Sequence, residues 1–224
     1  MRVTLLGIGA MASPRYAPAG LLVEHRGHRV MLDGGPGAEP EGRLDAWLVT
    51  DPRAELIGPI RRLAAAWGLD PRVAASRRGE LHIVPRRVVH TAHPTYGYLI
   101  ATGRHRIVWA PEFLRFPAWA AGAALVFADA AGWDHPIRFA GGVGGHAAVR
   151  AVAAAARRRR VGRLVFAHLG RPTLRALDAG QRPAFGEIGV EGRTYRPRAP
   201  RTPAQRGPAR RPRRGCKGSA RDPS

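Results

Sequence analysis

Apolar, strand-like runs that each stop at a polar residue place the strongest constraint on the fold of this chain. The runs at 44–50, 104–112, 123–131 and 163–170 end at or beside Asp51, Glu112, Asp129 and His168. Helical patterns occupy 54–68, with Pro59 in its first turns, and 146–160. Functional sites of layered α/β folds gather where strands end. The pattern therefore predicts a layered α/β domain in which several of these polar groups share one site.

Further strand patterns fill the rest of the first half. Residues 2–10 form a short apolar run that enters a Gly-rich turn, and 20–35 contain two strand-like runs around a turn at Arg26 and Gly27. Strands are also expected at 80–92 and 95–102, and Gly68 is the expected C-cap of the first helix. Two β-rich halves, each with helices behind it, predict a four-layer sandwich or a layered α/β domain.

Charge and composition divide the chain into a domain and a tail. The 224 residues are 45% hydrophobic, which is enough for one sizeable core, and carry a net charge of +21. Residues 196–224 contain ten Lys and Arg and one acid, Asp222, and hold no aromatic side chain and no aliphatic one larger than Ala. Such a segment cannot bury enough surface to offset its ordering entropy. We predict a domain at 1–197 and a disordered, Arg- and Pro-rich basic tail at 198–224.

Several classes of protein are excluded by what the sequence lacks. The single cysteine, Cys216, lies in the predicted tail, which excludes disulfides within the domain and Cys-based zinc sites. No run approaches the roughly 20 apolar residues of a membrane span, and the first apolar run is too short for a signal peptide. We expect a cytoplasmic protein with no membrane partner.

An ordered set of motifs resembles the metallo-β-lactamase fold, especially its tRNase Z-like and phosphodiesterase-like branch. The set comprises "VTLLGIGA", "GLLVEHRGHRVMLDGGPG" with its Asp-x-Gly-x-Gly ending, "HPTYGYLI", "RIVWAPE", "GGHAAVRAV" and "LVFAHLG". The resemblance runs from Met1 to about residue 197. It implies a metal-dependent hydrolase with the four-layer αββα fold, whose members hold two zinc ions.

One motif of that family is degenerate here. The family's Thr-His-x-His-x-Asp-His corresponds to "TDPRAEL", so Asp51, Arg53, Glu55 and Leu56 replace its three histidines and its aspartate. Arg has no lone pair to give and carries a fixed positive charge, and Leu56 removes a ligand outright. These changes predict that a standard two-zinc site is absent. Arg53 is expected to pair with Asp51, Glu55 or Glu112, since an unpaired buried charge costs several kcal/mol.

The other positions of the family's site are better kept. The resemblance implies that one divalent zinc, manganese or iron ion is held by Asp51, His90, Glu112 and His168. Either His90 or His93 fits the ligand before the Gly-Tyr pair, and His90 is favoured because it follows a strand. The alternative is that the two histidines and Glu112 bind no metal and hydrogen-bond among themselves.

The resemblance also assigns two catalytic roles. Glu55 would orient the attacking water, and His146 would protonate the leaving group. A histidine behind Gly-Gly at a helix start is equally suited to be a cap or a phosphate contact.

Two functions follow from these residues. The first is a metal-dependent hydrolase with a remodelled, at most mononuclear site, which acts on an anionic, phosphodiester-type substrate or nucleotide because the domain is basic. The second is a catalytically inactive descendant that binds nucleic acid or another polyanion through Arg53 and the basic tail. A regulatory module that binds a protein partner is a third hypothesis. Metal content separates the first two.

Overall fold

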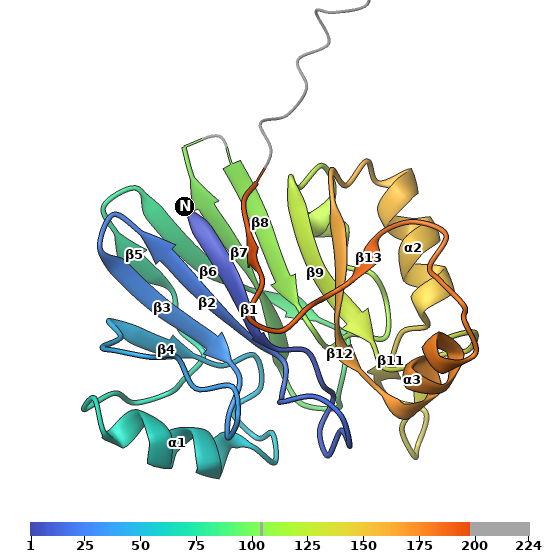
Figure 1. Cartoon of the computed structure of the whole chain (residues 1–224), viewed down its shortest axis with the longest axis horizontal. Coiled ribbons are helices and arrows are strands. Elements are labelled where there is room, and N and C mark those ends of the chain that lie inside the picture. The colour runs from blue at the N-terminus through green and yellow to red at the C-terminus, as the bar shows by residue number, and fades with distance from the viewer. Residues whose placement is uncertain (104, 198–224) are drawn as a thin grey trace, which may run out of the picture.

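The computed structural model describes residues 1–103 and 105–197, and the predicted tail at 198–224 lies outside the described residues. Two mixed β-sheets lie face to face, with helices outside them (Figure 1). The five-stranded sheet has the order β14 (Thr194–Tyr195), β1 (Arg2–Gly7), β2 (Gly20–His25), β3 (His28–Asp33) and β4 (Ala46–Leu48). The four-layer prediction is confirmed.

The second sheet has seven strands. Their order is β13 (Glu187–Ile188), β12 (Leu164–Leu169), β9 (Leu125–Ala130), β8 (His105–Ala110), β7 (Thr95–Thr102), β6 (Leu81–Val88) and β5 (Ser76–Arg78). A small pair, β10 (Ile137–Arg138) and β11 (Gly145–His146), stands apart from it. The helices are α1 (Ile57–Ala65), α2 (Val149–Arg158), α3 (Arg171–Asp178) and the 3-10 turn η1 (Ala118–Ala120).

Side chains along β2 and β3 point alternately to the two faces of the five-stranded sheet, and they contribute to two separate hydrophobic cores. Leu21 and Val23 face the core between the sheets, whereas Leu22 lies in a second cluster with Ile60 of α1. Because successive side chains of a strand point to opposite faces, this sheet is apolar on both sides. Its outer face is therefore covered by α1.

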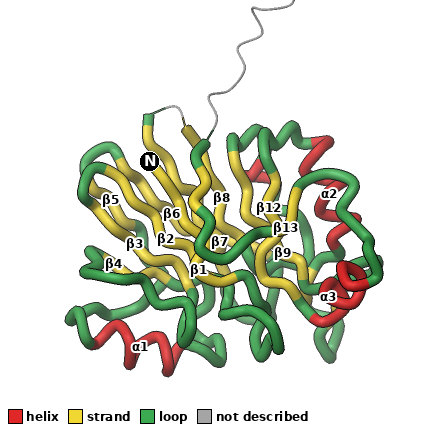
Figure 2. The backbone as a smooth tube through the Cα atoms, in the orientation of Figure 1, coloured by secondary structure: helices red, strands yellow, loops and turns green. Residues whose placement is uncertain are grey.

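The centre of the larger sheet is parallel and buried. β8 pairs with β9, and β9 pairs with β12, both in parallel. Every residue of β9 and β12 is buried, which is typical of parallel strands covered on both faces. The outer cover comes from α2, whose buried face includes Val149 and Val152. Parallel strands end at the same edge, and Figure 2 shows that loops occupy that edge between α1 and α3.

The expected elements differ from the observed ones mainly at their ends. The helix expected at 54–68 begins at Ile57, with Pro59 in its first turn as predicted, and its cap is Ala66. Gly68 takes the left-handed conformation two residues later, at φ +65°. The helix expected at 146–160 begins at Val149. The reason is that His146 lies in the short strand β11, where it pairs with Ile137 of β10.

Short elements were not predicted. They are β5, β10, β11, β13, β14, η1 and α3. No helix in residues 1–103 and 105–197 is both long enough and apolar enough to cross a membrane.

Candidate functional site

The strand-end polar residues come together because of the sheet register. Glu112 follows β8, Asp129 lies in β9 and His168 lies in β12, and these three strands are parallel neighbours. Two loops complete the cluster: His90 follows β6, and His146 lies in β11. Three of the four strand-end groups, Glu112, Asp129 and His168, thus lie in one cluster, which is called the cluster around Glu112 below.

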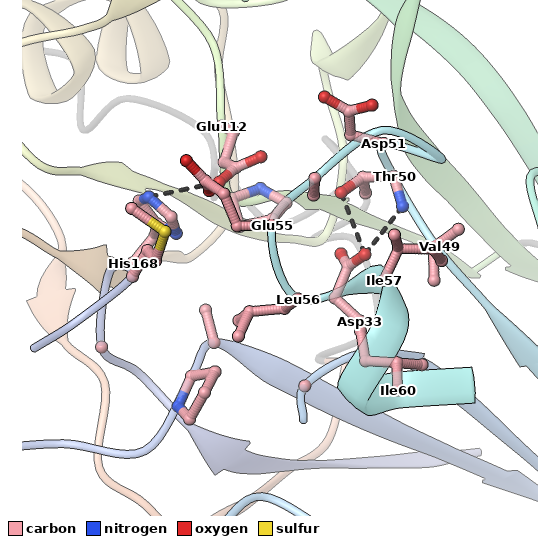
Figure 3. Close-up of a pocket in the computed structure, with 17 residues that line it drawn as sticks. Asp33, Val49, Thr50, Asp51, Glu55, Leu56, Ile57, Ile60, Glu112 and His168 are labelled. Atoms are coloured by element: carbon pink, nitrogen blue, oxygen red, sulfur yellow. Dashed lines mark hydrogen bonds and ion pairs between the residues drawn. The ribbon is translucent and has the colours of Figure 1, made fainter. Parts of the chain in front are cut away.

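Glu112 lies between two imidazoles. Its Oε2 is 3.5 Å from Nε2 of His90, and its Oε1 is 3.3 Å from Nε2 of His168. Figure 3 shows the contact with His168, and it shows Glu55 beside Glu112 on the wall of the same pocket. The pocket is small, about 60 Å³ in volume. The predicted residues His90, Glu112 and His168 thus form one group.

His90 is held by a glycine loop. Its Nδ1 lies 3.0 Å from the carbonyl of Gly145, and because a carbonyl only accepts, Nδ1–H is the donor. The backbone N–H of Gly145 donates in return to the carbonyl of His90. Gly144 has φ +83°, and a Cβ there would collide with the same His90 carbonyl. Only Nε2 of His90 is left to face Glu112.

His168 occupies a strained and dry position. Its φ of +61° is left-handed, at an irregularity in the pairing of β12 with β9. Burial lowers the pKa of His168 to about 3, and the nearby His146 and His90 act in the same direction. This imidazole is therefore neutral at neutral pH.

His146 is oriented by a buried carboxylate. Its Nδ1 donates to Oδ2 of Asp129 at 2.8 Å, and Asp129 also accepts from the backbone N–H groups of Phe113 and Ala131. Burial acts to lower the pKa of His146, but the charge and hydrogen bond of Asp129 outweigh it, so this pKa is raised. The ring of His146 is stacked on that of His168, 5.0 Å between centroids. An imidazole with a raised pKa thus lies against one with a lowered pKa.

Asp51 belongs to a different group. Its two oxygens lie 2.8 and 2.9 Å from Nε2 of His93, and its Oδ1 also accepts from the backbone N–H of Arg53. No ion pair or hydrogen bond within the described ranges joins Asp51 to His90, Glu112 or His168. In Figure 3 Asp51 lies apart from Glu112, although both line the pocket. The predicted four-residue ligand set is therefore divided, with His90 in one group and His93 in the other.

The prediction for Arg53 is wrong. Its side chain is exposed, and its guanidinium forms no ion pair within residues 1–103 and 105–197. The cause is local, because the Arg53 backbone N–H closes a turn onto Asp51 and the side chain leaves that turn towards solvent. His93, and not Arg53, is the partner that Asp51 needs.

Sequence analysis did not single out Asp33, which the Asp-x-Gly-x-Gly motif could have indicated. Its Oδ1 accepts from the backbone and hydroxyl of Thr50, at 2.7 and 3.0 Å, and its Oδ2 accepts from Trp109 Nε1 at 2.6 Å. Figure 3 shows the two bonds from Thr50. Asp33 thereby fixes the end of the strand from which the 51–56 loop departs.

A metal centre of the expected kind does not fit these residues. Among the residues described, no group of three or more His, Cys, Asp or Glu side chains could hold a metal ion. Glu112 lies 3.5 Å from His90 and 3.3 Å from His168, but these three side chains do not form such a group. Arg53 is exposed and Leu56 has no donor atom, so neither of these side chains can supply a metal ligand.

Comparisons with known proteins define the class of this fold. No protein-family model matches the sequence, and no curated protein is similar to it in sequence. Zn²⁺-bound PqqB from Methylobacterium extorquens has a similar structure, with a TM-score of 0.67 and 14% identity, covering 88% of this chain and 100% of that chain. The metallo-β-lactamase fold protein YhfI from Bacillus subtilis is also similar in structure, with a TM-score of 0.64 and 16% identity. The match covers 87% of this chain and 99% of that chain.

Short-form human tRNase Z is a third similar structure, with a TM-score of 0.63 and 12% identity, covering 89% of this chain and 100% of that chain. The chain therefore has the metallo-β-lactamase fold. At such identities the likeness shows the fold alone, so the function has to be argued from the site.

Proposed function

We propose that this chain is a hydrolase that acts on an anionic, phosphodiester-type substrate at the cluster around Glu112. The observation that carries the proposal is the 2.8 Å hydrogen bond from His146 to the buried Asp129. It fixes the imidazole through Nδ1, and Nε2 has no hydrogen-bond partner among the residues described. A partly buried imidazole with a carboxylate behind it and one free nitrogen is suited to general acid catalysis.

The proposed reaction divides two proton transfers between two groups. A water molecule attacks the phosphorus while its proton passes to the Glu112 carboxylate, and Glu55, on the same wall of the pocket, orients that water. As the bond from phosphorus to the leaving oxygen breaks, His146 gives that oxygen its Nε2 proton. Asp129 stabilises the imidazolium before the transfer, which accords with the raised pKa of His146.

The charge of the chain supports an anionic substrate. Its 37 Lys and Arg outnumber its 16 Asp and Glu, so its surface attracts phosphate esters over neutral molecules. The similar structures include a tRNase and a Zn²⁺-bound protein. No step above depends on a metal ion, since no group of three or more metal-ligating side chains converges among the residues described.

A second candidate function is binding of a polyanion without catalysis. The specific observation in its favour is that Arg53 is exposed at the loop where the family places metal ligands. Its guanidinium is free to contact a phosphate group there. In this case the imidazole cluster would be a relic of an ancestral site.

Hydrolysis of a dinucleoside monophosphate, whose alkoxide leaving group needs a proton, by the full chain tests the first function. His146→Asn should lower kcat by about 10²- to 10⁴-fold, the usual contribution of a general acid. His135→Asn is the matched control, because His135 is exposed and makes no contact with the cluster. No turnover by the parent, with or without added zinc, manganese or iron, would instead favour the polyanion-binding function.

A further inference from the structure

A second and larger cavity lies on the outer face of the seven-stranded sheet. It has a volume of about 700 Å³ and lies between α2 and the segment that follows α3. Figure 1 shows both helices on the side of the molecule opposite α1. Its walls include Trp133, Arg150, Arg157, Arg158, Arg182 and Phe185. None of these residues belongs to the cluster around Glu112.

The cavity has a concentrated positive charge. Four arginines line it, Arg150, Arg157, Arg158 and Arg182, and Arg150 is paired with Asp134 at 2.6 Å. In the described part of the chain, Arg157 and Arg158 are exposed and have no carboxylate partner. Arg182 donates only to backbone carbonyl groups. Three guanidinium groups are thus available to an anion.

Two aromatic residues, Trp133 and Phe185, also line the cavity, and binding of a simple anion would not require them. Trp133 is 5% exposed, and its Nε1–H is buried without a hydrogen-bond partner among the described residues. Buried donors are rarely left unpaired, and Trp133 is one of the residues that line the cavity. Phe185 is half-buried, so part of its ring is open to the cavity.

We infer that this cavity binds single-stranded nucleic acid, with phosphates on Arg157, Arg158 and Arg182 and an unstacked base against Phe185. Aromatic rings bordered by arginines are how proteins bind single strands, because every base has a face that can stack. A duplex keeps its bases stacked and has none to offer. The inference does not rest on the proposed hydrolysis, since the two sites share no residue.

The helix dipole is the competing explanation for part of this charge. Arg157 and Arg158 lie in the last turn of α2, where cations are favoured whatever the function. The dipole does not explain Arg182, which follows α3, nor the buried N–H of Trp133. It also does not explain a cavity of this size. Binding and helix stability make different predictions for the same substitution.

Fluorescence anisotropy of a labelled 12-mer of oligouridylate with the full chain tests the inference. Arg157→Ala with Arg158→Ala should weaken binding about tenfold and reduce the slope of log K against log salt by about 1.4, or 0.7 for each lost phosphate contact. The matched control is Arg77→Ala with Arg78→Ala, an exposed arginine pair on β5 at the far side of the same sheet. Both double variants remove two charges and keep residues 198–224.

Phe185→Leu separates nucleic acid from other polyanions. It should weaken binding of the oligouridylate several-fold and leave binding of heparin unchanged, because heparin has no base to stack. Circular dichroism spectra like that of the parent show that each variant folds. Three results would each overturn the inference. They are an equal loss of oligouridylate affinity in the two double variants, an equal loss of affinity for oligouridylate and heparin in Phe185→Leu, and equally tight binding of a 12-base-pair duplex.

Discussion

Asp33 gives the sharpest test of the electrostatics beside the site. Burial raises the pKa of this carboxyl group to about 7 from 3.8, although the hydrogen bonds from Trp109 and Thr50 oppose the rise. The folded chain therefore binds a proton at pH values where the unfolded chain has lost it. Stability linked to Asp33 is fully present below about pH 4, falls as the pH rises towards 7, and is constant above that.

The size of this effect follows from the two pKa values. Each pKa unit corresponds to about 1.4 kcal/mol, so the full change is about 4 kcal/mol, of which about 3 kcal/mol falls between pH 5 and pH 8. Asp33→Asn has nearly the same shape and cannot ionise. We expect the stability of this variant, relative to the parent, to improve by about 3 kcal/mol from pH 5 to pH 8.

Urea unfolding followed by far-UV circular dichroism at four pH values measures this difference. Comparison with the parent cancels the titration of all other groups, and Asp70→Asn, at an exposed position, controls for the loss of one carboxylate. If the difference in stability between Asp33→Asn and the parent does not change with pH, the three hydrogen bonds keep Asp33 ionised throughout. The argument that burial dominates at this position would then be refuted.

Three further results are expected. Tyr98→Phe removes a hydroxyl that donates to a buried backbone carbonyl at 2.8 Å, and urea unfolding should show a loss of about 1–2 kcal/mol. Removal of 198–224, which has no large apolar side chain, should leave the thermal midpoint nearly unchanged, and a large fall would show that the segment packs on the domain. Arg53→His, Glu55→Asp and Leu56→His together should raise zinc affinity in calorimetry, because they restore family ligands; no gain over the parent would contradict this.

The fold could be predicted because its signals are regular and local. Apolar runs with polar ends identified the long strands, and the turn at Arg26 and Gly27 identified the β2–β3 hairpin. The helix α3 was missed because eight residues, with a proline at the second, are too few for a helical period to stand out. His146 was placed at a helix start, but its position depends on pairing with Ile137, which no local pattern shows.

The site was predictable only where a strand positions the residue. Glu112 and His168 meet because β8, β9 and β12 are parallel neighbours, so the strand ends in the sequence were a sufficient guide. The pairing of Asp51 with His93 joins two loops and depends on how each of them turns. Spacing in the sequence does not encode that, which is why His90 and His93 could not be told apart.

The same distinction separates the 51–56 loop from the strand-borne part of the site. Asp51, Arg53 and Leu56 lie in or next to turns, where a substitution disturbs little packing. Asp129 is fully buried and accepts three hydrogen bonds, two from backbone N–H groups, so replacing it would cost stability as well as orientation of His146. Asp129 thus has a structural role of its own, whereas His146, through its 2.8 Å bond, adds only one donor to an acceptor that the backbone already uses. It is therefore His146, and not the carboxylate behind it, that bears on whether this site carries out chemistry.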